Sequence, residues 1–274
     1  MNKLDHLLKI LKNMQSAVIA FSGGCDSTFL LKALKLSGIK ALAVTTKSEI
    51  VPSSEIIFAK KIAGEIGIKH KIIETNEFMT NDFTKNSLDR CYICKDTRFK
   101  AISKIAKENG FCSIIEGSNK DDLKDYRPGF KAVKKYGVIS PLIDAGFSKK
   151  DIRNYSKKLG LITWNKPSSA CLATRIPYGY KITKKNLNRI EKSEKFLYSL
   201  GFKNIRVRDH DILARIELPS SEFKILCTSG MRKLIERKLR SYGYIFVSVD
   251  LSDFKTGSMN RLIKPYNKFR LKNE

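Results

Sequence analysis

The stretch that most constrains this chain is residues 17–28, with the sequence AVIAFSGGCDST. An apolar run rich in β-branched residues ends in a serine, two glycines and an aspartate, and a helix-like run, residues 29–34, follows at once. This order predicts a buried strand, a tight turn and a helix N-terminus. Glycines at the turn let the backbone approach a bound anion, because a Cβ there would collide with it. The exposed N–H groups of the helix start would attract a phosphate.

The residue types in the turn indicate which class of phosphate-binding loop it belongs to. The pattern Ser-Gly-Gly-x-Asp-Ser lacks the lysine of a Walker loop and does not match the dinucleotide fingerprint. It resembles the pyrophosphate loop (PP-loop) of ATP pyrophosphatases, which split ATP into AMP and pyrophosphate. The resemblance implies an ATP site formed by Ser22, Gly23, Gly24, Asp26 and Ser27. Asp26 would help to hold Mg²⁺, which prefers a carboxylate together with phosphate oxygens. A glycine-rich turn that binds nothing is the alternative.

Strand and helix patterns alternate after this turn. Further strands are expected at residues 40–46, 69–74 and 112–116, with a fifth at 137–142, and a helix at 53–67. Such alternation predicts an α/β fold with a parallel sheet. Ligands of these sheets bind at the carboxyl ends of the strands. Ser22, Thr46 and Gly117 follow or end predicted strands, so we expect them to line one crevice.

The pattern changes after residue 148. A helix at 148–159 leads into a loop rich in Pro, Ser and Gly, and a basic helix at 183–200 is followed by shorter strand and helix patterns. We therefore predict two domains, a PP-loop domain at 1–164 and a smaller C-terminal α/β domain at 165–274. The basic tail from Arg261 onward is expected to be loose.

Charge and hydropathy limit the partners. The chain has 53 Lys and Arg against 27 Asp and Glu, a net charge of +26. Such a field attracts nucleotides, carboxylate substrates or nucleic acid, although lysines on solvated faces explain it equally well. No apolar run is long enough to cross a bilayer, and the first residues lack the apolar core of a secretion signal. We expect a cytoplasmic protein with no membrane partner.

The six cysteines are candidates for metal binding or catalysis rather than for disulfides. Cys91 and Cys94 stand three residues apart at the start of a helix-like run, where the positive helix end favours thiolates. The pair alone is compatible with half of a zinc site, a redox pair or two buried thiols. The three histidines are not spaced for zinc. We favour Cys171 as a third ligand, because three thiolates can hold a [4Fe–4S] cluster and leave one iron open.

The remaining cysteines are given structural roles. Cys25 lies inside the glycine-rich turn, and we expect it to be structural. Cys112 and Cys227 stand in apolar runs and are expected in the core.

Longer motifs carry a family resemblance. Residues 116–122 (EGSNKDD), 125–129 (DYRPG), 166–179 (KPSSACLATRIPYG) and 206–210 (RVRDH) follow the PP-loop in this order. Together they resemble the LarE family, ATP-dependent sulfur transferases that build the nickel-pincer nucleotide cofactor of lactate racemase. The resemblance implies that ATP adenylates a carboxylate of pyridinium-3,5-biscarboxylic acid mononucleotide, pyrophosphate leaves, and sulfur is delivered to give a thiocarboxylic acid. The second carboxylate is treated likewise. The resemblance also implies that the C-terminal domain, residues 165–274, binds the substrate and takes part in sulfur transfer.

The cysteine content separates two types within this family. In one type the cysteine at the position of Cys171 attacks the adenylate and loses its own sulfur, becoming dehydroalanine. Members with three cysteines resemble a type in which a [4Fe–4S] cluster receives hydrosulfide, from solution or from another sulfur donor, and delivers it catalytically. This chain has Cys91, Cys94 and Cys171, so the resemblance implies the cluster type.

Basic residues of the C-terminal part are candidates for holding the anionic nucleotide. Arg206 and Arg208 alternate as on a strand, so both guanidiniums would face one side and suit a phosphate and a carboxylate. Arg175 is a third candidate, with a surface ion pair as the alternative role. Glu194 and Glu217 could serve a metal or general-base site, whereas a solvated helix face is the better interpretation for Glu191.

Two other functions share some of these features. A tRNA thiolation enzyme would have the adenylating loop, three cysteines and the basic charge, but the chain has no zinc-ribbon pairs or RNA module with interleaved aromatics. Nucleic acid is therefore not an expected partner. The third possibility is an AMP-sensing module without chemistry. A homo-oligomer is expected.

Overall fold

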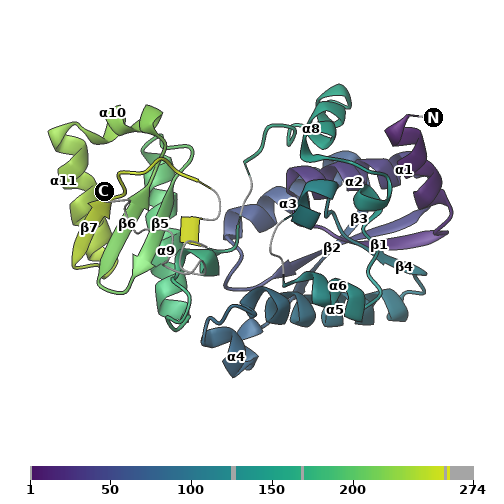
Figure 1. The fold of residues 1–274 in the computed structure, drawn as a ribbon, viewed down its shortest axis with the longest axis horizontal. Helices are drawn as coiled ribbons and strands as arrows, with labels where there is room; N and C mark the ends of the chain where they lie inside the picture. The colour runs from purple at the N-terminus through teal and green to yellow at the C-terminus, as the bar shows by residue number, and fades with distance from the viewer. Residues whose placement is uncertain (1, 125–127, 168–169, 256–257, 260–274) are drawn as a thin grey trace, which may run out of the picture. The chain divides into compact units, whose positions relative to one another are not determined.

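The computed structural model describes residues 2–124, 128–167, 170–255 and 258–259 (Figure 1). The chain divides into two compact units, and each is described by itself. The first unit consists of Met1–Phe83 and Leu88–Ser169, and the second of Thr84–Ser87 and Ala170–Glu274. The predicted tail from Arg261 onward lies outside the described residues.

A parallel sheet of four strands forms the centre of the first unit, as the alternating pattern predicts. The strands are β1 (Ser16–Ala20), β2 (Lys40–Lys47), β3 (Lys69–Glu74) and β4 (Ser113–Ile115), in the spatial order β3-β2-β1-β4. The prediction of a fifth strand at residues 137–142 is wrong. Ile139 forms a single bridge to Ile115, and helix α7 (Pro141–Asp144) begins two residues later. Pro141 has no N–H to donate to a ladder and suits the first turn of a helix.

Helices cover both faces of this sheet (Figure 1). The helices of the first unit are α1 (Lys3–Lys12), α2 (Cys25–Ser37), α3 (Ser53–Ile66), α4 (Asn81–Thr84), α5 (Arg90–Glu108), α6 (Phe130–Lys135), α7 and α8 (Lys149–Lys158), with 3₁₀ turns η1 (Glu77–Met79) and η2 (Lys120–Lys124). Ile19 and Ala43 pack with α1, α2 and α3, whereas Val18 and Val44 pack with α5 and α6. Successive strand residues point to opposite faces, so both sides of β1 and β2 are apolar.

The second unit is a smaller α/β arrangement. Its sheet has the order β5-β6-β7, from β5 (Arg206–His210), β6 (Leu213–Glu217) and β7 (Phe246–Val249), with one antiparallel and one parallel pairing. Its helices are α9 (Lys184–Ser199), α10 (Phe223–Leu226) and α11 (Ser229–Ser241), with 3₁₀ turns η3 (Leu172–Arg175) and η4 (Ser220–Glu222). Leu197, Val207 and Leu239 join these elements in one apolar cluster.

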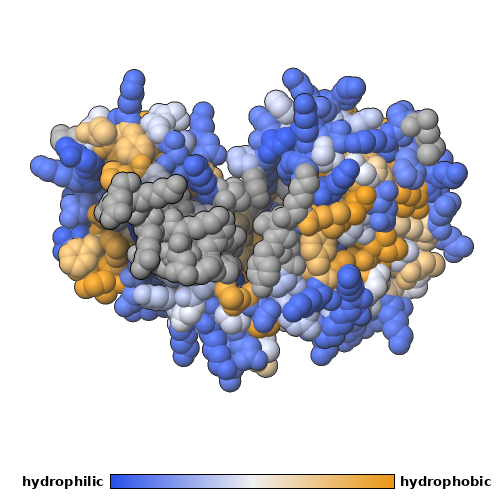
Figure 2. All heavy atoms as spheres, in the orientation of Figure 1, coloured by the Kyte–Doolittle hydropathy of each residue, from blue (hydrophilic) through white to orange (hydrophobic). Residues whose placement is uncertain are grey.

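The face of the molecule drawn in Figure 2 is mostly hydrophilic, in keeping with the excess of lysine and arginine in the sequence. Within the part of the chain that the structure describes, no helix combines the length and apolar character needed to cross a membrane.

The aromatic cluster between α2 and α8 provides a test of the first unit's core. Phe147 is fully buried, and its ring lies 5.1 Å from Phe29 and 5.5 Å from Tyr155, between centroids. We expect Phe147→Ala to lower the free energy of unfolding by about 3–5 kcal/mol, since it removes a buried ring and leaves a cavity. Urea denaturation followed by fluorescence measures this. The exposed Ile57 is the control, and Ile57→Ala should change stability by about 0.5 kcal/mol at most. Equal effects of the two would contradict the described packing.

Candidate active site

The chain leaves β1 at the carboxyl edge of the sheet and turns into α2 within four residues. Gly23 has φ +70°, a left-handed conformation that glycine adopts without strain, and a Cβ there would lie 3.0 Å from the Cα of Ala59. Hydroxyl groups close the turn, since Ser22 Oγ and Ser27 Oγ are 3.1 Å apart and Ser27 Oγ donates to the Gly24 carbonyl at 3.2 Å. The turn is therefore fixed by its own side chains and by the backbone of α3.

The start of α2 is suited to an anion. Gly24 occupies the N-cap position with extended geometry, and no side chain among the described residues accepts a capping hydrogen bond from the first-turn N–H groups. These N–H groups have no partner within the helix, and the positive end of the helix dipole adds to their attraction for negative charge. The geometry is that of a helix N-terminus prepared for a phosphate.

Asp26 contacts a lysine that the motif analysis did not select. Lys149 Nζ lies 2.6 Å from Oδ1 and 2.5 Å from Oδ2 of Asp26. Burial raises the pKa of the Asp26 carboxyl above its ordinary value, although Lys149 opposes that rise. This lysine is the first residue of α8, far from the loop in sequence.

The predicted neighbour Gly117 lies directly against the loop. A Cβ on Gly117 would stand 3.1 Å from the backbone nitrogen of Ser27 and 3.2 Å from its Cα. The adjacent Glu116 is buried and accepts hydrogen bonds from Ser140 Oγ at 2.8 Å and from Lys95 Nζ at 3.3 Å. Burial alone would raise the pKa of Glu116, but Lys95 and the bound hydroxyl and amide groups outweigh it and lower that pKa.

The end of β2 also contacts the loop, through a threonine next to the predicted one. Thr45 is buried, and its hydroxyl donates to the Phe21 carbonyl at 2.7 Å, while His70 Nε2 lies 2.8 Å from the same hydroxyl. Thr46, the residue we predicted, is half-buried at the same end of β2 and pairs in register with Ile73. Burial, with a smaller contribution from Lys60, lowers the pKa of His70.

The paired thiols lie at the start of α5 in the first unit. Cys91 is exposed, and Cys94 is half-buried with its thiol 3.9 Å from Oε1 of the fully buried Glu77. Lys95, the next residue, reaches Glu116 and so connects this end of α5 to the strand end beside the PP-loop. Cys171 belongs to the second unit, where it is the half-buried N-cap residue of η3. Among the described residues, no three Cys, His, Asp or Glu side chains converge closely enough to hold a metal ion.

The expected positions of two other cysteines are wrong. Cys112 and Cys227 are exposed rather than in the core. Cys112 immediately precedes the first residue of β4, and Cys227 is the C-cap of the short helix α10, so each lies just outside an element rather than within it. Cys25, to which we gave a structural role, is buried, with its thiol 3.8 Å from the Trp164 carbonyl.

Two of the three arginines predicted to bind the anionic nucleotide form buried ion pairs within the second unit. Arg175 is 2% exposed and makes two hydrogen bonds to Glu194, of 3.0 and 2.9 Å, so its pair is in the interior rather than at the surface. Burial would lower the pKa of Arg175, but Glu194 more than compensates and raises it. Arg208 lies 2.5 Å from Oε2 of the buried Glu217. Glu194 and Glu217 therefore neutralise arginines. Glu191 pairs with Lys195 one helical turn away.

Arg206 has different surroundings. Its side chain is buried, donates to the Tyr198 hydroxyl at 3.3 Å and to the Ile205 carbonyl at 2.6 Å, and stacks on Phe254. Burial, and then repulsion by Arg175, lower the pKa of Arg206. A nearby anion would favour its charged form.

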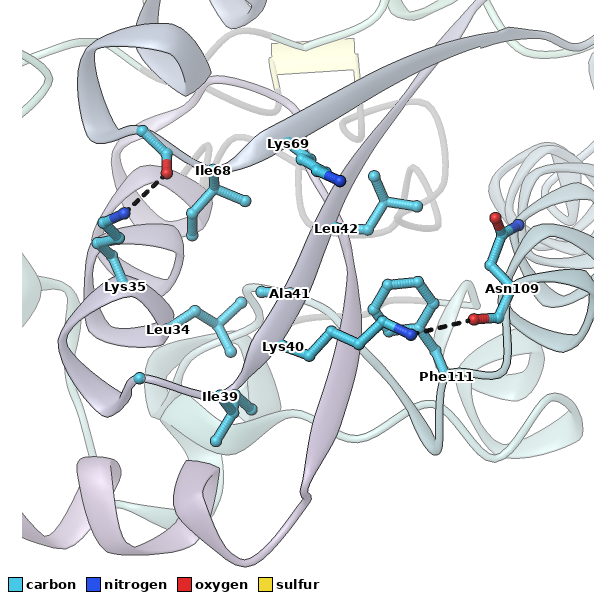
Figure 3. A pocket seen from close by; sticks show the side chains of 12 residues that line it. Leu34, Lys35, Ile39, Lys40, Ala41, Leu42, Ile68, Lys69, Asn109 and Phe111 are labelled. Carbon is cyan, nitrogen blue, oxygen red and sulfur yellow. Dashed lines mark hydrogen bonds between the residues drawn. The ribbon is translucent and has the colours of Figure 1, made fainter.

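A pocket of about 480 Å³ lies at the other edge of the first unit's sheet, where β2 and β3 begin (Figure 3). Lys35 and Lys40 point toward helix ends there and donate to the carbonyls of Gly67 and Asn109. These lysines neutralise the negative ends of α3 and α5. The pocket is at the amino ends of the strands, opposite the PP-loop, so it is not the predicted crevice.

Three lysines of the site were missed by the sequence analysis: Lys95, Lys149 and Lys166. Lys166 donates to the Gly23 carbonyl at 3.3 Å and to Glu55 at 2.8 Å, and its ammonium lies 3.8 Å from the centre of the Phe58 ring. In a chain with this many lysines, no local pattern distinguishes these three. Only the presence of Lys166 at the head of the motif at residues 166–179 gave a signal.

Comparisons with known proteins agree with this geometry. A family model described as a PP-loop domain matches residues 1–126. The chain is 38% identical over 257 residues to the pyridinium-3,5-bisthiocarboxylic acid mononucleotide synthase of Lactiplantibacillus plantarum, covering 93% of this chain and 92% of that one. It is 36% identical to an uncharacterized protein of Synechocystis, covering 96% and 98% of the two chains. A solved NMN synthetase from Francisella tularensis has a similar fold, with a TM-score of 0.50, 17% identity and coverage of 61% of this chain and 74% of that one.

The contact at Gly117 yields a prediction for the loop. We expect Gly117→Ala to weaken ATP binding by about 10-fold or more, because the new methyl group meets backbone atoms that cannot rotate away. A loss of about 1.4 kcal/mol in binding free energy is enough for a 10-fold weaker affinity. Isothermal titration calorimetry with ATP measures it.

Gly64→Ala is the matched control, since Gly64 lies inside α3 and a Cβ there would have no atom within 4 Å. This change should leave ATP binding unaltered and slightly stabilise the helix. Wild-type affinity in Gly117→Ala would show that the loop does not need this close contact.

Proposed function

This chain belongs to the LarE family of PP-loop ATP-dependent sulfurtransferases, and we propose that it converts pyridinium-3,5-biscarboxylic acid mononucleotide into the bisthiocarboxylic acid. The observation that carries the proposal is the open N-terminus of α2, with Asp26 beside it and Gly117 packed against its first turn. The family relationship extends over 93% of the chain and therefore includes both units.

The PP-loop would activate the substrate. A carboxylate is a poor electrophile, so one of its oxygens first attacks the α-phosphorus of ATP. The bond from this phosphorus to the bridging oxygen breaks, and pyrophosphate leaves. The N–H groups at the start of α2 and the hydroxyls of Ser22 and Ser27 stabilise the charge that develops on pyrophosphate. Sulfide then attacks the carboxyl carbon, and AMP departs with the electron pair of the broken acyl–oxygen bond.

Two further roles in the first unit follow from position. Asp26 would hold Mg²⁺, which neutralises the phosphates and suits a site with one carboxylate and phosphate oxygens. Thr46 and Gly117 stand at the ends of β2 and β4 that adjoin the loop, and we assign them to the nucleotide crevice.

Arg206 is the proposed anchor for the phosphate of the substrate in the second unit. Its side chain is buried, and burial and the repulsion of Arg175 both disfavour its charge. It contacts the Tyr198 hydroxyl, the Ile205 carbonyl and the Phe254 ring. A substrate phosphate would offset that repulsion and accept a bidentate hydrogen bond. Arg175 and Arg208 are already paired with Glu194 and Glu217, so an anion near them would compete with these two carboxylates.

The cysteines suit an iron–sulfur centre by their chemistry. Cys91 and Cys94 are free cysteines that stand three residues apart at the N-terminal end of α5. Cys171 is a third free cysteine, partly exposed, at the start of η3. We propose that these three residues hold a [4Fe–4S] cluster, which supplies one iron without a protein ligand as a place for hydrosulfide. The alternative is that Cys171 gives up its own sulfur.

The reaction is tested with the purified protein, MgATP, sulfide and the dicarboxylate mononucleotide. We expect AMP and pyrophosphate to form only when the mononucleotide is present, with a product that has sulfur in place of a carboxylate oxygen by mass spectrometry. Arg206→Gln should raise KM for the mononucleotide about 10-fold or more through loss of a charged contact, with ATP binding unchanged. Pyrophosphate release that depends on tRNA instead of the mononucleotide would overturn the proposal.

The cluster is tested by anaerobic reconstitution and an assay for iron and sulfide. Wild-type protein should bind about four irons per chain, and Cys91→Ala, Cys94→Ala and Cys171→Ala should each lose them. Cys112→Ala and Cys227→Ala are matched controls, since both thiols are exposed but lie outside the proposed set, and they should keep the iron. Iron retention in any of the first three variants would contradict the ligand assignment.

A further inference from the structure

The pocket at the amino ends of β2 and β3 is a cavity that the proposed reaction does not use. Its volume of about 480 Å³ is within the range of cavities that hold small molecules. The helices α2, α3 and α5 end beside it, at Gly38, Gly67 and Asn109. Because the negative end of each helix dipole lies there, the backbone favours cations at this place.

Two lysines supply those cations and leave the cavity open (Figure 3). The ammonium of Lys35 donates to the Gly67 carbonyl at 2.9 Å. The ammonium of Lys40 donates to the Asn109 carbonyl at 3.4 Å and lies 4.7 Å from the centre of the Phe111 ring. The methylene chains of both lysines line the wall, while the charged ends are held by the helix ends. The cavity is therefore preformed, which lowers the cost of binding a ligand there.

A third lysine adds a positive charge that no carboxylate neutralises. Lys69 pairs in register with Leu42, and its ammonium points toward Leu42 in Figure 3. Within the described part of the chain, this ammonium has no hydrogen-bond or ion-pair partner, and no aspartate or glutamate lines the pocket. Lys69 is thus the cation that remains available to a ligand.

The rest of the wall is apolar and sets the second requirement for a ligand. It is formed largely by side chains that flank the amino ends of the strands: Ile39, Leu42, Ile68 and Phe111. Burying an apolar group against them is favourable, and one anionic oxygen can pair with Lys69. A polyphosphate fits poorly, because its further charges would have to draw the other two lysines away from the helix ends.

We propose that this pocket is a second ligand site, for a small amphipathic carboxylate. The carboxylate accepts a charge-assisted hydrogen bond from Lys69, and the apolar body lies against Leu42 and Phe111. β2 begins at this pocket, and Thr46 stands near its other end, beside the PP-loop, so the two sites lie at opposite ends of one strand. The inference is independent of the sulfur-transfer reaction and of the ATP site.

The probe for the test is 4-phenylbutyrate, which combines an aromatic ring with one carboxylate. Its uncharged counterpart is 4-phenylbutan-1-ol, and butyrate is the counterpart without the ring. Isothermal titration calorimetry of the full chain should show a single site for phenylbutyrate. Each counterpart should bind about 10-fold more weakly or worse, because each lacks one of the two contacts. Equal binding of the alcohol would contradict the role of the lysine.

A pair of variants tests the assignment of Lys69. Lys69→Gln should weaken phenylbutyrate binding about 5-fold or more through loss of the charged contact. Lys71→Gln is the matched control, because Lys71 is an exposed lysine of the same strand, lies outside the lining and changes by the same charge. Its affinity should stay within about 2-fold of wild type. Equal losses in the two variants would reduce the effect to general attraction by a basic protein and overturn the proposal.

Nuclear magnetic resonance of wild-type protein with ¹⁵N-labelled glycine locates the probe without any substitution. Gly38 and Gly67 line the pocket, whereas Gly23 and Gly24 belong to the PP-loop at the other edge of the sheet. Phenylbutyrate should shift the amide signals of Gly38 and Gly67 and leave those of Gly23 and Gly24 in place. Shifts confined to the PP-loop glycines, or no binding to the wild-type protein, would refute the site.

Discussion

The close contact of backbone with backbone around the PP-loop is the constraint on which the site depends. Gly23 packs against Ala59 of α3, and Gly117 packs against Ser27 in the first turn of α2. At both places a methyl group would meet main-chain atoms, which cannot move as a side chain can. The loop is thus held from two sides at fixed distances, and the N–H groups of α2 point to one position because neither neighbour can shift.

Lysines supply the charge at this edge of the sheet, and each of the three that contact the site is paired with an acidic residue. Lys149 pairs with Asp26, Lys95 with Glu116, and Lys166 with Glu55. These pairs limit the repulsion between cations, and a phosphate group can compete for the ammonium groups. These three pairs carry no net charge, and most of the 53 basic residues, which give the chain its net charge of +26, are elsewhere.

The sequence was sufficient for the parts of the structure that depend on local pattern. The PP-loop turn and strands β2 and β3 follow from apolar periodicity and glycine, which act within a few residues. The fifth strand failed because an apolar run does not reveal whether Pro141 will start a helix. The prediction that Cys112 and Cys227 lie in the core was wrong, because apolar neighbours indicate a buried element but not which nearby residues lie at its exposed end.

Contacts between distant segments could not be predicted in the same way. Lys149 lies 123 positions from Asp26, and its role is set by the hydrogen bonds of residues 119–122, not by its own neighbours. Arg175 and Arg208 were identified as anion-binding candidates from their type, but their pairing with Glu194 and Glu217 depends on the packing of α9 and β6. Residue type indicated the charge, and tertiary structure decided its partner.

The central claim about the chemistry is that Cys171 acts as a ligand and keeps its sulfur. The most direct measurement is the intact mass of the protein, with peptide mapping at residue 171, before and after one turnover with MgATP, sulfide and the mononucleotide. The account predicts an unchanged mass and repeated turnover in wild-type protein, and no product from Cys91→Ala. A Cys91→Ala protein that turns over once and returns lighter by one sulfur at residue 171 would contradict it and establish Cys171 as the consumed donor.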